Sequence, residues 1–281
     1  MADITILENV CSKVEGAVES LIVPDGVSEL APYAVSEHRE LLSVSIPETV
    51  TKIGAHAFYN CRSLSHLELT DCIEDIGDGA FKNCQRIRTI TIHIRKGQFR
   101  VLKGILSDIN QEIRVNLIYP DVEAHLIFPY YLYNYEENTP ARIVNQITEG
   151  AGIQYQACIR ADGIDFAGYD RLFKSSIYID VQDSGFKIAI ARLSTPLELS
   201  DAARAQYEAF LKEHAVDICE KLLEADNQED FKTLLQLNLF EKDTLDKVVN
   251  LCQRKAFTAG LSTCIEYKNK RFGGRKKTYE F

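Results

Sequence analysis

Residues 46–69 read IPETVTKIGAHAFYNCRSLSHLEL, and residues 69–92 read LTDCIEDIGDGAFKNCQRIRTITI. A shift of 23 positions aligns the two segments without a gap, and the matched positions are Val50/Ile73, Gly54/Gly77, Phe58/Phe81, Cys61/Cys84 and Leu64/Ile87. The same shift backwards pairs Pro47 with Pro24 and Leu64 with Leu41. A weaker match to the same pattern precedes these units, with apolar residues in register at Ile4, Leu7, Val18 and Leu21. A fixed period of this length predicts a repeat architecture from the start of the chain to Ile92.

The spacing inside one unit predicts its shape. Leu67 and Leu69 alternate with polar residues, which places them on the inner face of a short strand. The proline then ends the strand because it has no N–H to donate, and we expect Gly54 to allow a turn and Ala57-Phe58 to fill the far side of the coil. One coil cannot bury this apolar set alone, whereas stacked coils bury a continuous core. The strands are then expected to form a parallel sheet with about 4.8 Å between neighbours.

This pattern resembles the BspA-type leucine-rich repeat, whose units read Ile-Pro-x-x-Val-x-x-Ile-Gly-x-x-Ala-Phe-x-x-Cys-x-x-Leu-x-x-Leu-x-Leu. The units 44–66 and 67–89 match it nearly throughout. The unit 21–43 departs from it at Ala31, Val35 and His38, as expected of a terminal, capping repeat. The resemblance implies a right-handed solenoid, a bacterial source, and a role in adhesion or protein binding without chemistry of its own. Known secreted members of this class act at cell surfaces.

The repeat region is expected to close at about residue 118. Phe99, Leu102, Ile105, Leu106 and Ile109 have helical spacing, and Ile113 and Val115 follow Ile90 and Ile92 by the same period as the earlier units. We therefore expect a last repeat that contains a full helix. After a turn at Tyr119-Pro120-Asp121, residues 122–128 are expected to return as an antiparallel edge strand.

Residues 119–182 form a predicted connector that is rich in tyrosine. Its densest aromatic run contains Tyr130, Tyr131, Tyr133 and Tyr135. Exposed aromatic rings stack on sugars or bases, whereas such runs more often pack the joint between two domains. Both interpretations stay open here, with the joint favoured. Phe166, Tyr169 and Phe173 predict a short helix with an inward face.

Residues 183–267 are predicted to be helical. Pro196 breaks a helix and Ser200 is a suitable N-cap for the next. An offset of 30 then matches Ile218 with Val248, Leu222 with Cys252 and Leu234 with Cys264. The predicted fold class is an α+β repeat protein whose leucine-rich-repeat solenoid is followed by helical hairpins similar to ankyrin pairs, although the Thr-Pro-Leu-His signature is missing. The order of the regions also resembles leucine-rich-repeat proteins of gut-type Firmicutes, a likeness that brings no established activity.

Charge is distributed unevenly along the chain. The net charge is −9, but residues 254–281 contain eight bases and two acids, which leaves −15 on residues 1–253. An acidic body disfavours nucleic acid as a partner, because broad phosphate contact depends on Lys and Arg. Residues 268–281 are expected to form a solvated basic tail. No run approaches 18 apolar residues and the start lacks a basic signal-peptide region, so we expect no membrane span and a cytoplasmic protein with reduced thiols.

No constellation in the sequence predicts catalysis or a cofactor. His38, Cys61 and Cys84 occupy one repeat position, and such residues are zinc ligands in other settings. A column of side chains about 4.8 Å apart is too regular to surround a tetrahedral ion, so these are interpreted as small buried plugs. The serine and cysteine residues lie outside known nucleophile signatures.

The predicted sheet offers a candidate interaction surface. Side chains next to the inward ones face the open side of the sheet in two rows, Ser20, Ser43, His66, Thr89 and Glu112, then Ile22, Ser45, Glu68, Thr91 and Arg114. The favoured function is a non-catalytic protein–protein interaction scaffold, either a monomer or a weak oligomer. Recognition of a glycan or small ligand at the tyrosines, and an enzyme site at the domain joint, are the alternatives.

Overall fold

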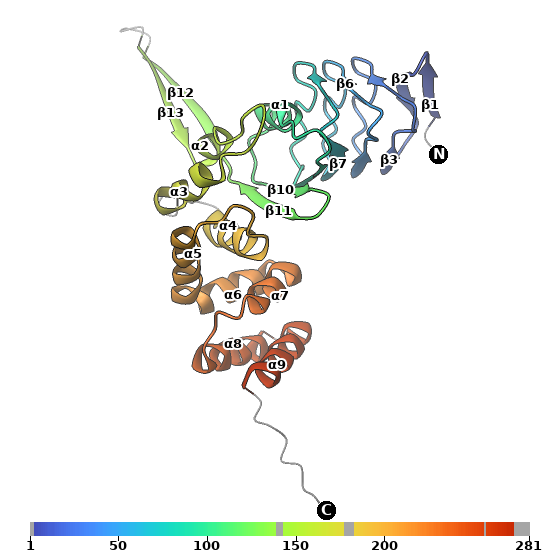
Figure 1. Ribbon diagram of the computed structural model, residues 1–281. Coiled ribbons are helices and arrows are strands. Elements are labelled where there is room, and N and C mark those ends of the chain that lie inside the picture. The colour runs from blue at the N-terminus through green and yellow to red at the C-terminus, as the bar shows by residue number, and fades with distance from the viewer. Residues whose placement is uncertain (1–2, 139–142, 177–182, 256, 273–281) are drawn as a thin grey trace, which may run out of the picture. The chain divides into compact units, whose positions relative to one another are not determined.

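The computed structural model describes residues 3–138, 143–176, 183–255 and 257–272, and of 133–138 and 143–147 the backbone only. The chain divides into two compact units, Met1–Gly185 and Phe186–Phe281. Figure 1 shows that the first unit begins as a stack of coils with short strands and continues into a two-stranded hairpin and the helices that follow it, while the second is made of helices. The predicted class, a solenoid of stacked coils with a parallel sheet followed by a helical region, is thereby confirmed, while the likeness to ankyrin pairs stays a prediction. Each unit is described by itself.

The main sheet of the first unit has six strands in the order β11-β10-β9-β7-β5-β3. Its parallel strands are β3 (Ser20–Ile22), β5 (Ser43–Ser45), β7 (His66–Thr70), β9 (Thr89–His93) and β10 (Ile113–Ile118). The predicted edge strand is confirmed as β11 (Glu123–Phe128), antiparallel to β10. One inward row, buried throughout, consists of Leu21, Val44, Leu67, Ile90 and Val115. Burial of this continuous apolar set stabilises the stack.

A second sheet runs along another side of the coils and was not predicted. Its order is β1-β2-β4-β6-β8, with β1 (Asp3–Leu7), β2 (Val10–Glu15), β4 (Glu29–Leu30), β6 (Lys52–Ile53) and β8 (Asp75–Ile76). Strands β1 and β2 form an antiparallel hairpin. The weaker match at Ile4 and Leu7 is therefore not a further coil. Leu7 is 63% exposed, so it is not an inward repeat position. Val18 and Leu21, the other two residues of this weaker match, are buried.

The turn in each coil uses left-handed backbone conformations that recur with the same period. The positive φ angles form two columns, Tyr33 (60°), His56 (57°) and Gly79 (62°), then Glu37 (66°), Asn60 (63°) and Asn83 (67°). Asparagine tolerates this conformation better than most residues, which explains its place before each repeat cysteine. Ala57 and Phe58 are fully buried, and the Phe58 and Phe81 rings stack at 4.9 Å between centroids. The prediction that Ala57 and Phe58 fill the far side of the coil is confirmed.

Glycine at positions 54 and 77 serves close approach, not the turn that the sequence suggested. Neither residue has a positive φ. A Cβ on Gly54 would lie 2.5 Å from the Pro32 nitrogen of the preceding coil, and one on Gly77 would lie 2.3 Å from the Ala55 nitrogen. The backbones of neighbouring coils meet at this position, so only glycine fits.

Helix α1 (Arg100–Asp108) interrupts the period and corrects the predicted register. Thr89 pairs with Arg114, and Thr91 pairs with Asn116, so the last parallel strand arrives later in the sequence than the period requires. The prediction that Ile113 and Val115 continue the repeat spacing is wrong, because the coil that contains α1 is longer than the others. Arg114 consequently belongs to the first outward row, in the place predicted for Glu112.

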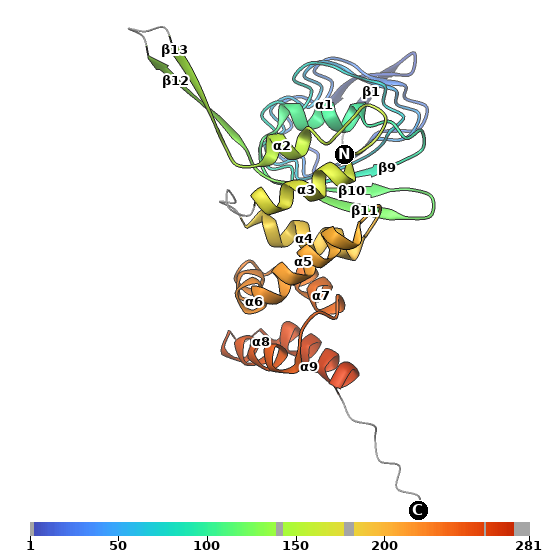
Figure 2. The ribbon, with the colours of Figure 1, turned by 60° about the vertical axis from the view of Figure 1, so that its left-hand side comes forward.

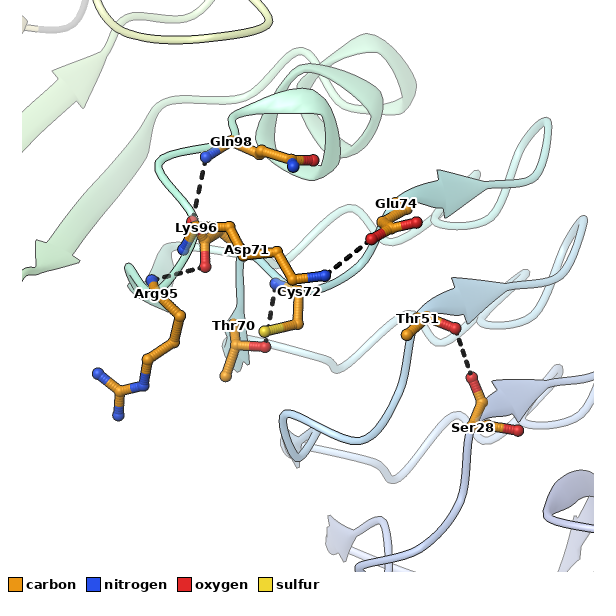
Figure 3. A network of polar contacts seen from close by, with 9 residues as sticks. All are labelled: Ser28, Thr51, Thr70, Asp71, Cys72, Glu74, Arg95, Lys96 and Gln98. Atoms are coloured by element: carbon orange, nitrogen blue, oxygen red, sulfur yellow. Dashed lines mark hydrogen bonds and ion pairs between the residues drawn. The ribbon is translucent and has the colours of Figure 1, made fainter.

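A buried carboxylate holds the loop that leads into α1. Asp71 is fully buried, and its two oxygens accept hydrogen bonds from the backbone N–H groups of Arg95 (2.7 Å), Lys96 (2.8 Å) and Gln98 (3.1 Å). Figure 3 shows these donors around Asp71, with the exposed Lys96–Glu74 ion pair (2.7 Å) beside them. The carboxylate satisfies three donors that secondary structure leaves open.

The remainder of the first unit contains the predicted connector. Its elements are β12 (Leu132–Asn138) paired with β13 (Ile143–Glu149), α2 (Gly152–Gln156) and α3 (Phe166–Ser176). Phe166, Tyr169 and Phe173 are buried, which confirms the predicted inward face of α3. The Tyr169 hydroxyl donates to the Ile127 carbonyl (2.6 Å) and accepts from the Ile127 N–H (2.9 Å), tying α3 to β11.

Helix α4 (Ser184–Ser194) begins at the boundary between the units, and α5 (Asp201–Glu213) follows. Ser200 caps α5 by accepting from the Ala203 N–H at 3.2 Å, as predicted. The remaining helices are α6 (Ala215–Glu224), α7 (Gln228–Gln236), α8 (Lys242–Arg254) and α9 (Thr258–Phe272). Helix α6 contacts α8 and α7 contacts α9, in agreement with the offset of 30 and with Figure 2.

The C-terminal boundary differs from the prediction. Helix α9 continues to Phe272, so residues 268–272 of the predicted tail are helical, and residues 273–281 lie outside the described part. None of the helices in the described ranges has the length and apolar character needed to cross a membrane.

Candidate interaction surface

The outward face of the six-stranded sheet brings all seven predicted surface residues together. Strand pairing aligns Ser43, His66, Thr89 and Arg114 in one row. Ser45, Glu68 and Thr91 follow in the next row, which ends at Asn116 in place of the predicted Arg114. His66 and Glu68 are exposed, while the serines, the threonines and Arg114 are half-buried. Because successive strand residues point to opposite faces, the rows alternate with the buried apolar rows.

Hydrogen bonds within this surface fix part of its arrangement. The Ser43 hydroxyl donates to Ser20 at 2.9 Å. His93 Nε2 lies 2.8 Å from Glu68 Oε1, so the imidazole of one strand meets the carboxylate of the next. Sequence reasoning missed His93, which belongs to a third outward row with Thr70 and Ile118. His93 follows Thr70 by one repeat period, and this was the available signal.

A serine and a histidine are in contact on this surface. Ser65 Oγ lies 2.7 Å from His66 Nδ1 and donates to the Leu42 carbonyl at 3.0 Å. The serine hydroxyl has a single proton, so the Leu42 carbonyl and the imidazole compete for it. The arrangement therefore orients His66 on the surface.

The repeat cysteines are part of the packing between coils. Cys61 Sγ donates to the Val35 carbonyl and Cys84 Sγ to the Phe58 carbonyl, each at 3.1 Å. Burial raises the pKa of Cys61 to about 12 and also raises that of Cys84. His38 Nδ1 lies 3.1 Å from the carbonyls of Val35 and Ser36. Among the described residues, no three His, Cys, Asp or Glu side chains are grouped as metal ligands.

The predicted ligand aromatics occupy different environments. Tyr131 is only 7% exposed, and Tyr130 is half-buried. The side chains of Tyr133 and Tyr135 fall outside the described residues, although their backbone belongs to β12. Nearby, the Tyr155 and Tyr169 rings meet edge to face at 4.6 Å, and Tyr155 hydrogen-bonds Ser176 at 2.9 Å. These two tyrosines pack the core of the first unit.

Comparison with known proteins concerns the repeat region. Residues 5–112 match the model of the BspA type leucine rich repeat region in six copies. Solved structures of leucine-rich repeat proteins from Eubacterium ventriosum (20% identity, TM-score 0.30) and Bacteroides ovatus (25%, 0.22) match 31% and 36% of this chain. A leucine rich cell surface protein from Faecalibacterium prausnitzii matches 43% (22% identity, TM-score 0.27).

The matches cover 24%, 33% and 43% of the Eubacterium, Bacteroides and Faecalibacterium chains, so this chain spans less than half of each. No curated protein matches the chain. The recurring Gly and Ala-Phe positions of the stacked coils agree with the family match, so residues 5–112 are similar to the BspA type leucine rich repeat region.

Proposed function

We propose that the chain is a non-catalytic protein–protein interaction scaffold that binds its partner on the outward face of the six-stranded sheet. The observation that carries this proposal is the alignment of Ser43, His66 and Thr89, with Ser45, Glu68 and Thr91 beside them, on consecutive parallel strands. Repeat proteins commonly bind partners on such extended surfaces.

The chemistry of the surface supports hydrogen-bonded recognition. Serine and threonine at four of the central positions are short, so a partner backbone can approach the sheet closely. His66 and Glu68 rise between them as exposed polar anchors. The Glu68–His93 contact orders one of these anchors before binding, which lowers the entropic cost of association.

The test compares two double variants of the full chain. His66→Ala with Glu68→Ala removes the anchors, and Asp78→Ala with Lys82→Ala is the control, because these two residues lie on the turn 77–84, away from the sheet. Each protein is immobilised, and its partners are captured from the source organism and quantified.

The proposal predicts that the sheet variant loses about tenfold or more of at least one partner that the control variant retains. Equal partner profiles for both variants and the native chain would contradict it. Circular dichroism and urea unfolding check whether both variants remain folded.

The proposal includes a cytoplasmic location. All eight cysteines are free thiols, which suits a reducing compartment. Fractionation of the source cells with an antibody to the repeat region tests the location, and recovery in the medium or at the cell surface would contradict it.

A further inference from the structure

The N-terminal end of the first unit exposes apolar side chains beside a strand edge. Among the exposed large apolar side chains of the described residues, Leu7 (63%) and Ile6 (40%) belong to β1. β1 is the terminal strand of its sheet, and no strand in the described ranges pairs with its outer edge. Such an edge presents backbone N–H and C=O groups to an incoming strand.

This end is also strongly acidic. Residues 3–30 contain six acids and one base, a net charge of −5. Asp3 lies directly opposite Glu15 in the β1–β2 hairpin, and the base, Lys13, is bound to Glu15 at 2.5 Å. Like charges directly opposite each other are unfavourable. An incoming strand with basic residues therefore relieves repulsion at this edge while covering Leu7, which lies on the same face of β1 as Asp3.

The chain carries a segment of this chemistry at its other end. Residues 273–281 read GGRKKTYEF, with three bases and one acid. In an extended strand, Tyr279 and Phe281 share one face, and Arg275 and Lys277 lie on that face too. Threonine, tyrosine and phenylalanine favour strands.

We propose that residues 273–281 of a second copy add to the outer edge of β1 as a further strand. Backbone hydrogen bonds supply the pairing, Tyr279 and Phe281 cover the exposed Leu7 side chain, and the bases meet the acidic group around Asp3 and Glu15. The contact joins unlike surfaces, so it is a head-to-tail association between copies. It is independent of the sheet face proposed above.

The test measures self-association of the full chain by sedimentation equilibrium over a range of concentrations. The native chain is expected to rise in mean mass with concentration, and to return towards the monomer in about 0.5 M salt because ion pairs are screened. Leu7→Lys adds a cation at the edge, and the triple variant Arg275→Ser, Lys276→Ser and Lys277→Ser neutralises the tail. Each is expected to weaken association about tenfold or more.

Leu42→Lys is the matched control, since Leu42 is 46% exposed and directly precedes β5 of the six-stranded sheet, whereas β1 belongs to the other sheet. It is expected to associate like the native chain. A labelled peptide of residues 270–281 is also titrated into the triple variant, where it should bind and lose affinity on addition of Leu7→Lys. A native chain that stays monomeric, or equal effects of Leu7→Lys and Leu42→Lys, would overturn the proposal.

Discussion

At the residue scale, the spacing between coils depends on the absence of a side chain at Gly54. The nearest atoms to a Cβ there are backbone atoms of the preceding coil, which cannot rotate away. We predict that Gly54→Ala lowers the free energy of unfolding by about 2 kcal/mol through overpacking. Gly163→Ala is the control, because nothing lies within 4 Å of its Cβ position, and it should change stability by less than about 0.5 kcal/mol. Urea unfolding measures both, and equal losses would refute the close-approach argument.

The buried thiol of Cys61 makes stability depend on pH. Its pKa is about 12 in the folded chain and about 8.5 when unfolded, so only the unfolded chain ionises between those values. Stability is therefore present below about pH 8.5 and is lost as the pH rises towards 12. Between about pH 8 and 10 the native chain should lose about 2 kcal/mol more than Cys61→Ala. If the native chain and Cys61→Ala lost equal stability over this pH range, Cys61 would ionise equally in the folded and unfolded chains.

Thiol reactivity distinguishes Cys72 from the other cysteines. Cys72 is partly exposed, whereas the other seven are buried. In native buffer, we expect one thiol per chain to react rapidly with a disulfide reagent, and Cys72→Ser to remove that phase. Rapid reaction of several thiols in the Cys72→Ser variant would show that the cores of the two units open readily.

At the element scale, Asp71 organises the entry to α1. Asp71→Ala leaves three backbone donors without their acceptor, and we expect a loss of about 3 kcal/mol because buried unsatisfied donors keep their full desolvation cost. Glu74→Ala is the comparison: it removes the exposed ion pair of the same network and should leave the unfolding midpoint essentially unchanged. If Asp71→Ala changed the stability as little as Glu74→Ala does, the loop would be held by other contacts.

The elements of the first unit differ in how far the sequence could predict them. Positions such as Leu67, Phe58 and Cys61 were predictable, because each recurs once per coil and is buried by the same neighbours every time. The second sheet was not, since its strands of two residues are too short to show an alternating pattern. The shift at Arg114 was also missed, because the coil that contains α1 is longer than the others and its length cannot be read from the period of the preceding coils.

At the scale of the whole molecule, one surface was predictable and another was not. The outward rows followed from strand alternation alone, apart from the strand beyond α1 and the additional residue His93. The exposed edge of β1 could be identified only from the structure, where the N-terminal segment is a hairpin. In the sequence, Ile4, Ile6 and Leu7 have the apolar character of a further coil.

The central claim, that the outward sheet face is where a partner binds, is tested most directly by site-specific photo-cross-linking in the source cells. A photoreactive amino acid is placed at Ser45 on the sheet face, at Thr91 two strands away on the same row, and at Lys82 on the turn as the reference. We expect cross-linked adducts of one common partner from positions 45 and 91 and none of that partner from 82. Adducts from 82 alone, or the same adducts from all three positions, would contradict it.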